Sequence, residues 1–225
     1  MQATRLIAIR HGETAWNVDT RLQGHLDIAL NTKGVWQAAQ TARAVAHETV
    51  DAVYSSDLLR AWQTANAIAH ATEAPVIANP GLRERGFGSF EGKTYAEIAT
   101  EWPDQSELWR KRVPDWSPPG GESLVAMRER VSATVKALAE KHVGGQIVLV
   151  AHGGVMDILY RMATGVQPFR GPTAIAVIMA ISADTPPPAV HLNPALPRGL
   201  SDLIDRLLAK HPKDRPQQAR EVIAA

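Results

Sequence analysis

Two histidines each follow a short apolar run and precede glycine. His11 and Gly12 come after "RLIAIR", and His152, Gly153 and Gly154 come after "QIVLVA". Ligands of open α/β sheets bind beyond the carboxyl ends of the strands. If the two strands are neighbours, the histidines would therefore face each other across one site. Glycine after each histidine would let the backbone approach a ligand closely.

Two arginines accompany these histidines. Arg10 directly precedes His11, and Arg60 lies about one turn into a predicted helix whose expected N-cap is Ser56. The beginning of a helix carries partial positive charge and suits anions. Two arginines, two histidines and a helix N-terminus are the groups that a bound phosphoryl group requires.

This combination indicates phosphoryl transfer with histidine as the nucleophile. A neutral imidazole has a lone pair that can attack phosphorus. The leaving oxygen then needs a proton, which a carboxylic acid can supply. Glu84, in the glycine-rich "LRERGFGSFEG", is the first candidate for this acid, and Glu13 and Glu91 are alternatives.

Alternating strands and helices must position these groups. Apolar spacing predicts strands within 5–10, 50–56, 74–80 and 146–154, and helices within 32–48, 57–71, 123–142 and 155–164. The run from residue 146 is the most apolar and is expected to be central in the sheet. The pattern predicts an α/β fold, a three-layer α/β/α sandwich with a mostly parallel central sheet.

The segment 93–121 departs from this alternation. It carries three tryptophans seven residues apart, Trp102, Trp109 and Trp116. Prolines at 114, 118 and 119 prevent one continuous helix through Trp116. We interpret the segment as an insertion that could cover the active site, and a packed surface excursion is an equal alternative.

Six blocks occur in order along the chain: "RHGETAWN", "RLQGHLDIALNTKG", "SSDLLRAWQTA", "LRERGFGSFEG", "PGGES" and "VLVAHGG". Over about residues 4–165 they resemble the histidine phosphatase superfamily, which has the phosphoglycerate mutase-like fold. Within it, the chain is similar to the phosphatase branch of broad-specificity and α-ribazole phosphatases.

The resemblance implies a role for each site residue. His11 becomes phosphorylated, and Glu84 protonates the leaving group and then activates water. Arg10, Arg60 and His152 hold the phosphoryl oxygens and complete the expected catalytic set. The expected substrate-binding residues are Asn17, Gln23, Gly24 and Gly153. No metal and no cofactor are implied.

Hydrolysis of a small phosphorylated metabolite is the expected reaction, with a cofactor-dependent phosphoglycerate mutase as the alternative. Mutases of this family carry a longer insertion with additional basic residues that grip a carboxylate. Between residues 91 and 121 the cations of this chain are Lys93, Arg110, Lys111 and Arg112. This short set favours a phosphatase.

The last part of the chain differs in character from the rest. We expect a domain over 1–183, closed by a strand within 173–182, then a proline-rich linker over 184–198. An amphipathic helix is predicted in 199–225 from Leu200, Leu203, Ile204, Leu207 and Leu208. Residues 199–223 resemble the C-terminal end of a bacterial serine/threonine kinase domain, but no kinase catalytic motif accompanies them.

The composition of the chain excludes some kinds of chemistry and some classes of partner. The chain has 225 residues, no cysteine and a formal net charge of +1. These values exclude thiolate chemistry and favour neither nucleic-acid nor membrane partners. We expect a cytoplasmic enzyme whose partner is a small phosphorylated substrate. The oligomeric state stays open, with a homodimer as one alternative.

Overall fold

The computed structural model describes residues 3–164, 185, 187–194 and 198–207. The chain divides into two compact units, one up to Ile158 and one from Leu159 onward. The first unit contains the sheet and is described first. Within the described residues, no helix is both long and apolar enough to cross a membrane.

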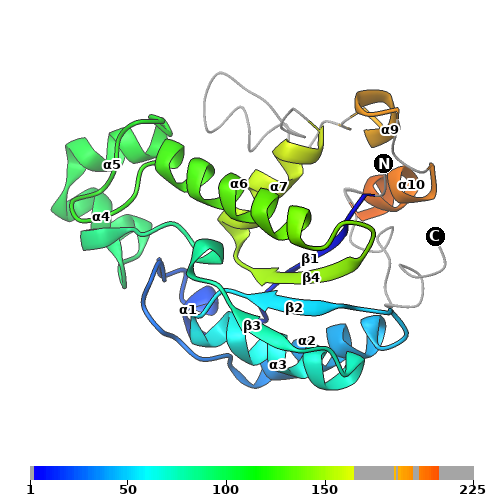
Figure 1. Cartoon of the computed structure of the whole chain (residues 1–225). Coiled ribbons are helices and arrows are strands. Elements are labelled where there is room, and N and C mark those ends of the chain that lie inside the picture. The colour runs from blue at the N-terminus through cyan, green and yellow to red at the C-terminus, as the bar shows by residue number, and fades with distance from the viewer. Residues whose placement is uncertain (1–2, 165–184, 186, 195–197, 208–225) are drawn as a thin grey trace. The chain divides into compact units, whose positions relative to one another are not determined.

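Within the described ranges, four parallel strands form the sheet, in the order β1-β4-β2-β3 (Figure 1). Their bounds are β1 (Arg5–Arg10), β2 (Ala52–Ser55), β3 (Val76–Ala78) and β4 (Gln146–Ala151). β4 lies between β1 and β2, and its last five residues are buried, which confirms the prediction of a central apolar strand. Arg10 at the end of β1 pairs with Ala151 at the end of β4. The histidines that follow these strands therefore start from adjacent positions.

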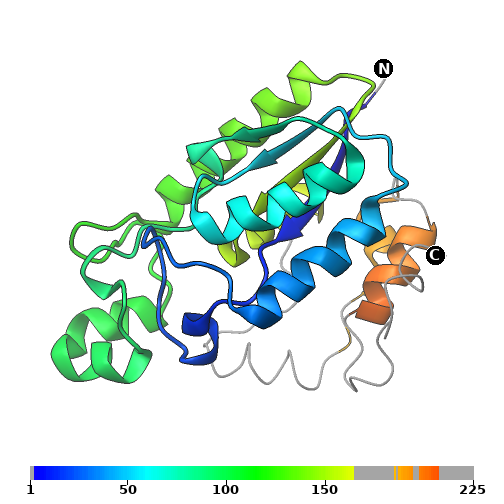
Figure 2. The same cartoon turned by 90° about the horizontal axis from the view of Figure 1, so that it is seen from below.

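Helices cover both faces of the sheet. α2 (Thr32–Val45) and α3 (Leu59–Thr72) lie on one face, and α6 (Leu124–Lys141) lies on the other (Figures 1 and 2). α7 (Gly153–Thr164) begins directly after β4. Fully buried Val53, Ile68 and Val148 belong to the core between the sheet, α2 and α3. The predicted α/β/α arrangement is confirmed.

The prediction of Ser56 as the N-cap of α3 is wrong. The helix begins at Leu59, and the N-cap position is held by Leu58, whose side chain accepts no hydrogen bond. The amide of Leu59 donates instead to the carboxylate of Asp27, from a distant loop. The Ser56 hydroxyl accepts from the Leu58 amide at 3.3 Å and contacts His152. A carboxylate brought in by the tertiary fold thus replaces the local cap.

The tryptophan-rich segment folds around one buried phenylalanine. It contains α4 (Tyr95–Glu101) and α5 (Pro103–Arg110), which interrupt the helix that a seven-residue spacing could suggest. Phe90 is fully buried, with ring centroids 5.5, 5.6 and 6.1 Å from those of Trp102, Trp109 and Trp116. The spacing therefore reflects packing around Phe90. The remaining short elements of this unit are α1 (Ala15–Val18), η1 (Pro80–Leu82) and η2 (Gly88–Phe90).

The second unit contains the end of α7, α9 (Ala189–Leu192) and α10 (Arg198–Leu207). Ser201 of α10 is buried, and its hydroxyl accepts from the Val190 amide at 3.1 Å. α10 overlaps the segment 199–225, for which an amphipathic helix is predicted. The expected strand within 173–182 lies outside the described residues.

Candidate active site

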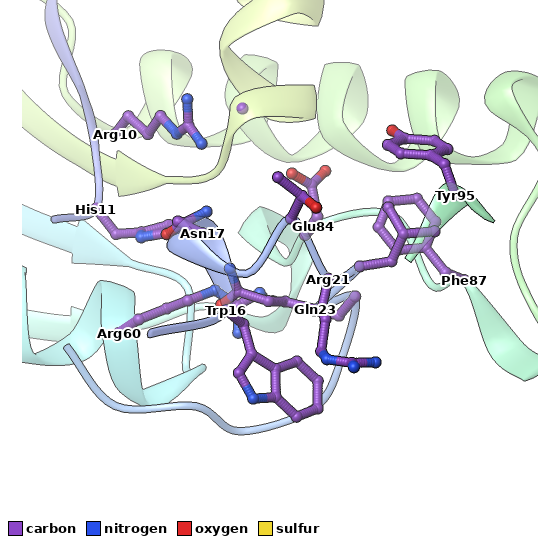
Figure 3. A pocket seen from close by; sticks show the side chains of 14 residues that line it. Arg10, His11, Trp16, Asn17, Arg21, Gln23, Arg60, Glu84, Phe87 and Tyr95 are labelled. Carbon is purple, nitrogen blue, oxygen red and sulfur yellow. The ribbon is translucent and has the colours of Figure 1, made fainter. Parts of the chain in front are cut away.

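A cavity of about 300 Å³ lies where β1 ends and α7 begins (Figure 3). Eight of the nine residues predicted for the site line it, namely Arg10, His11, Asn17, Gln23, Gly24, Arg60, Glu84 and Gly153. The sequence interval between the first and the last of these spans most of the first unit. The sheet edge and its loops therefore assemble the predicted groups at one place.

One of the two ring nitrogens of His11 is engaged in a hydrogen bond with the backbone. Its Nδ1 lies 2.7 Å from the carbonyl oxygen of Gly12. Because a carbonyl only accepts hydrogen bonds, Nδ1 carries the proton and Nε2 keeps its lone pair. Burial lowers the pKa of His11 to about 4, and the charges of Arg60 and Arg10 act in the same direction against the Gly12 hydrogen bond. The ring is thus neutral at ordinary pH, with the lone pair of Nε2 unprotonated.

His152 lies against His11 and is absent from the cavity lining. The two ring centroids are 5.1 Å apart in an edge-to-face arrangement, and His152 is fully buried. Its Nε2 lies 2.8 Å from the Ser56 hydroxyl, while its Nδ1 has no hydrogen-bond partner in the described part of the chain. Burial lowers the pKa of His152, and the charge of Arg60 lowers it further. The ring is neutral and supports the position of His11.

Two arginines line the cavity in different ways. Arg60 is 1% exposed and donates to the carbonyl oxygens of Leu26 at 2.8 Å and Gly24 at 2.7 Å. Its Nε has no partner among the described residues, and burial lowers its pKa to about 10, which leaves it charged. Arg10 is exposed, and its guanidinium lies beside Gly153. Each arginine retains N–H donors for an anion.

The glycines after the two histidines serve different purposes. A side chain on Gly12 would collide with the backbone of Gly34 in α2, so Gly12 permits close packing of helix and strand. The expectation that Gly12 makes room for a ligand is wrong. Gly153 lines the cavity, and a Cβ there would lie 3.7 Å from Arg10 Cζ, an ordinary contact.

The carboxylate of Glu84 points into the cavity (Figure 3). Oε1 accepts from the Arg85 amide at 2.9 Å, and Oε2 accepts from the Gly154 amide at 3.1 Å. A Cβ on Gly154 would collide with this carboxylate. Two backbone amides and one obligatory glycine therefore define where the carboxylate sits.

The two competing carboxylates are engaged elsewhere. One oxygen of Glu91 accepts from the amides of His25 and Phe87, both at 2.9 Å, so it joins two loops. Glu13 binds Asn31 and Lys33, each at 2.9 Å. Neither lines the cavity. Of the three candidate carboxylates, Glu84 is the one that lines the cavity.

The loop from residue 17 to 24 supplies polar groups to the cavity. Asn17 Oδ1 accepts from the Thr14 amide at 3.0 Å, which leaves the side-chain NH₂ as a donor for a ligand. Gln23 is 8% exposed, and its Oε1 has no partner among the described residues. Gly24 has φ of +49°, where glycine is favoured, and its carbonyl anchors Arg60.

Sequence reasoning did not assign the outer wall of the cavity. That wall consists of Trp16, Thr20, Arg21, Leu22, Phe87 and Tyr95. Arg21 is paired with Glu97 at 2.9 Å and with the Gly92 carbonyl at 2.8 Å. Several of these residues lie inside the quoted sequence blocks, but their role depends on how 93–121 folds back. The Leu22 amide donates to the Lys93 carbonyl at 2.9 Å and fastens this segment to the cavity loop.

The described residues contain no group of three or more histidine, aspartate or glutamate side chains suited to hold a metal ion. The cationic groups of the cavity are arginine side chains and the N-terminal end of α7. These can bind a phosphoryl dianion through charge-assisted hydrogen bonds.

Comparison with known proteins agrees with this geometry. Residues 6–178 match the family model described as "Histidine phosphatase superfamily (branch 1)". The match ends before 199–223, whose resemblance to a kinase stays a prediction.

Relatives with curated names extend over most of the chain. "Phosphoglycerate mutase-like protein 4" of Arabidopsis thaliana is 38% identical over 161 residues, 70% of this chain and 70% of the relative. "Metal-independent phosphoserine phosphatase" of the same plant is 37% identical over 166 residues, 72% of this chain and 70% of the relative.

A solved structure of a putative α-ribazole-5'-P phosphatase from Escherichia coli superposes with a TM-score of 0.69 at 30% identity. The superposition covers 79% of this chain and 84% of that one. The four-stranded parallel sheet, the extent of the family match and these relatives lead to one conclusion: the chain belongs to the histidine phosphatase superfamily.

Proposed function

We propose that the protein hydrolyses a small phosphomonoester through a phosphohistidine formed at His11. The observation that carries this proposal is the 2.7 Å contact between Nδ1 of His11 and the carbonyl oxygen of Gly12. The Nδ1 proton is held by Gly12, so the lone pair of Nε2 is available in a cavity that also contains Arg10, Arg60 and Glu84. A nucleophile, an anion-binding set and a proton donor are thus present together.

In the first step, Nε2 of His11 attacks phosphorus, a P–N bond forms and the P–O bond to the leaving group breaks. Glu84, entering as the carboxylic acid, transfers its proton to the leaving oxygen. Arg10, Arg60 and the Asn17 amide hold the phosphoryl oxygens as charge shifts. The phosphorylated ring is cationic, and the hydrogen bond from Nδ1 to Gly12 stabilises it.

In the second step, the Glu84 carboxylate takes a proton from water, and the water oxygen attacks phosphorus. The P–N bond breaks, and its electron pair returns to Nε2 of His11. For His152, the family resemblance predicts contact with a phosphoryl oxygen. Its burial against His11 supports a function in the same step.

Water is the proposed acceptor because the insertion offers no free cation to the cavity. Lys93 and Lys111 pair with Glu101 and Glu107, both at 2.7 Å, and Arg112 lies 4.0 Å from Asp157. None of these three cations lines the cavity, and neither does Arg110, the fourth cation of the insertion. A phosphoglycerate mutase remains the alternative, and several relatives carry mutase names.

The outer wall favours a leaving group with a flat apolar part. Trp16, Leu22, Phe87 and Tyr95 supply apolar surface there, and the one cation of that wall, Arg21, is already paired with Glu97. In the part of the chain that the structure describes, a carboxylate of a substrate would meet no unpaired cation at this end of the cavity. We therefore place benzyl-like phosphomonoesters ahead of phosphoserine as substrates.

Two experiments test the proposal. Rapid quenching with radiolabelled substrate should trap phosphate on the wild-type protein and none on His11→Asn; label in that variant would overturn the mechanism. Phosphate release should be independent of added bisphosphoglycerate, whereas a mutase would require it for transfer.

Substrate class is tested with esters whose leaving oxygens are all alkyl. Benzyl phosphate should exceed propyl phosphate and phosphoserine in kcat/KM by about tenfold or more. Tyr95, which is 56% exposed, can be replaced without disturbing the core. Tyr95→Ala should reduce the preference for benzyl phosphate, and an unchanged preference would argue against this wall as the subsite.

A further inference from the structure

Arg130 of α6 uses all five of its N–H donors on one small region. Nε and Nη2 bind the two carboxylate oxygens of Glu122 at 2.9 and 2.7 Å. Nη1 donates to the carbonyls of Gly81 at 2.9 Å and Arg83 at 3.1 Å, and Nη2 donates to the carbonyl of Glu84 at 3.3 Å. Since an arginine side chain has five N–H donors, each donor of Arg130 has an acceptor.

The three backbone carbonyls that Arg130 binds belong to Gly81, within a short helix, and to Arg83 and Glu84, in the loop that follows it. η1 ends at Leu82 and η2 begins at Gly88, so Glu84 lies in the loop between them. The backbone of Glu122 is also hydrogen-bonded to Arg85 and Gly86, the two residues that follow Glu84 in this loop. Its amide donates to the Gly86 carbonyl at 2.8 Å, and its carbonyl accepts from Arg85 Nε at 2.6 Å.

The pair is also shielded and charge-balanced. The side chains of Arg130 and Glu122 are 26% and 19% exposed. Two parallel hydrogen bonds between a guanidinium and a carboxylate give directional strength that a lysine cannot reproduce. The positive charge beside Glu84 is therefore matched by the carboxylate of Glu122.

We propose that Arg130 and Glu122 form a positioning pair that holds Glu84 where its proton reaches the leaving oxygen. This proposal rests on the proposed function, in which Glu84 is the acid. His25 Nε2 donates to the same Glu84 carbonyl at 2.9 Å, so a second support exists and loss of the pair weakens the placement without abolishing it. Misplacement by about 1 Å costs on the order of a hundredfold in rate.

The test compares how much each variant lowers kcat/KM for two substrates whose leaving groups differ in their need for a proton. Nitrophenolate departs without a proton, whereas propyl alkoxide requires one. In Arg130→Lys, kcat/KM for propyl phosphate should fall about 10- to 100-fold, and kcat/KM for nitrophenyl phosphate should stay within about threefold. We compare kcat/KM because it reports the steps up to phosphorylation of the enzyme. Hydrolysis of the phosphoenzyme is the same for both substrates and does not affect it.

Three variants accompany this measurement. Glu84→Gln should show the same selective loss, more strongly. Arg128→Lys changes an exposed arginine on the same helix and should leave both substrates unaffected. If Arg130→Lys does not fold, Glu122→Gln retains one acceptor and should give the same pattern with smaller size. Thermal unfolding of each variant establishes that it is folded.

The outcomes separate the two proposals. If folded Arg130→Lys loses kcat/KM equally on both substrates, or loses none, the positioning pair is overturned. The assignment of Glu84 as the acid then still stands, provided that Glu84→Gln loses kcat/KM selectively on propyl phosphate. Absence of selectivity in Glu84→Gln overturns the acid assignment and the positioning pair with it. A phosphohistidine trapped at His11 in that case would still support the nucleophile.

Discussion

The carboxylate of Glu84 accepts a hydrogen bond at 3.1 Å from the amide of Gly154, the second residue after His152. The proposed acid is thus tied to the helix that begins beside the phosphoryl-binding groups. A side chain at Gly154 would collide with Glu84 and would approach Met127 Cε to 2.9 Å. The Glu84–Gly154 contact therefore links acid placement to the start of α7.

The two adjacent glycines of α7 provide a matched comparison. Gly154→Ala should lower kcat/KM for propyl phosphate by about a hundredfold, because Glu84 must move. Gly153→Ala should cost far less, because its Cβ would lie at an ordinary 3.7 Å from Arg10 Cζ. Steady-state kinetics on both variants decides the matter, and equal losses would contradict the proposed contact.

The two arginines of the cavity should respond differently to replacement by methionine. Arg60→Met leaves the carbonyls of Gly24 and Leu26 without their donor, at a cost of about 1–3 kcal/mol for each. Arg10→Met should change the free energy of unfolding by less than about 0.5 kcal/mol. Both should lower kcat/KM by about a hundredfold or more. Denaturant unfolding and kinetics measured together test this, and a stable Arg60→Met would contradict it.

The three candidate carboxylates should separate by phenotype. Glu13→Gln should keep its activity within about threefold, because Glu13 contacts Asn31 and Lys33 at the surface. Glu91→Ala removes the acceptor for two amides and should lower stability by about 1–3 kcal/mol. Only Glu84→Gln should combine normal stability with selective loss on alkyl phosphates. Selective loss in Glu13→Gln or Glu91→Ala would reassign the acid.

His11 should make the protein sensitive to mild acid. Its folded-state pKa is lowered from 6.5 to about 4, so between these values the unfolded chain binds a proton and the folded chain does not. Stability from this group is complete above the unfolded value and is lost as the pH falls, by up to about 3 kcal/mol. His11→Asn should lose less stability than wild type between about pH 7 and pH 5. Thermal unfolding at both pH values measures this, and parallel losses would contradict it.

Much of the architecture could be predicted from local sequence. The predicted strand over 5–10 coincides with β1, and the predicted helix over 123–142 differs from α6 by one residue at each end. Apolar periodicity specifies such elements because one face of each must be buried. The predicted set of site residues was also largely assembled in one cavity, since the carboxyl ends of parallel strands meet at one edge of a sheet.

Contacts between distant segments could not be predicted in this way. Ser56 has the composition of an N-cap, yet Asp27 supplies the acceptor at the start of α3. Gly12 seemed to make room for a ligand, yet α2 occupies the space beside it. In each case, a residue's neighbour came from another part of the chain, and local pattern contains no information about that neighbour.

The sequence by itself determined the alternation of the main strands and helices as far as residue 164, the absence of thiol chemistry and the residue types of a phosphoryl site. Tertiary structure alone decided that Glu84 rather than Glu91 faces the cavity, and that Arg130 and Glu122 grip the loop carrying it. The physical reason is that residue type and spacing set hydrogen-bonding capacity and local conformation. Which donor meets which acceptor depends on packing between segments far apart in the chain.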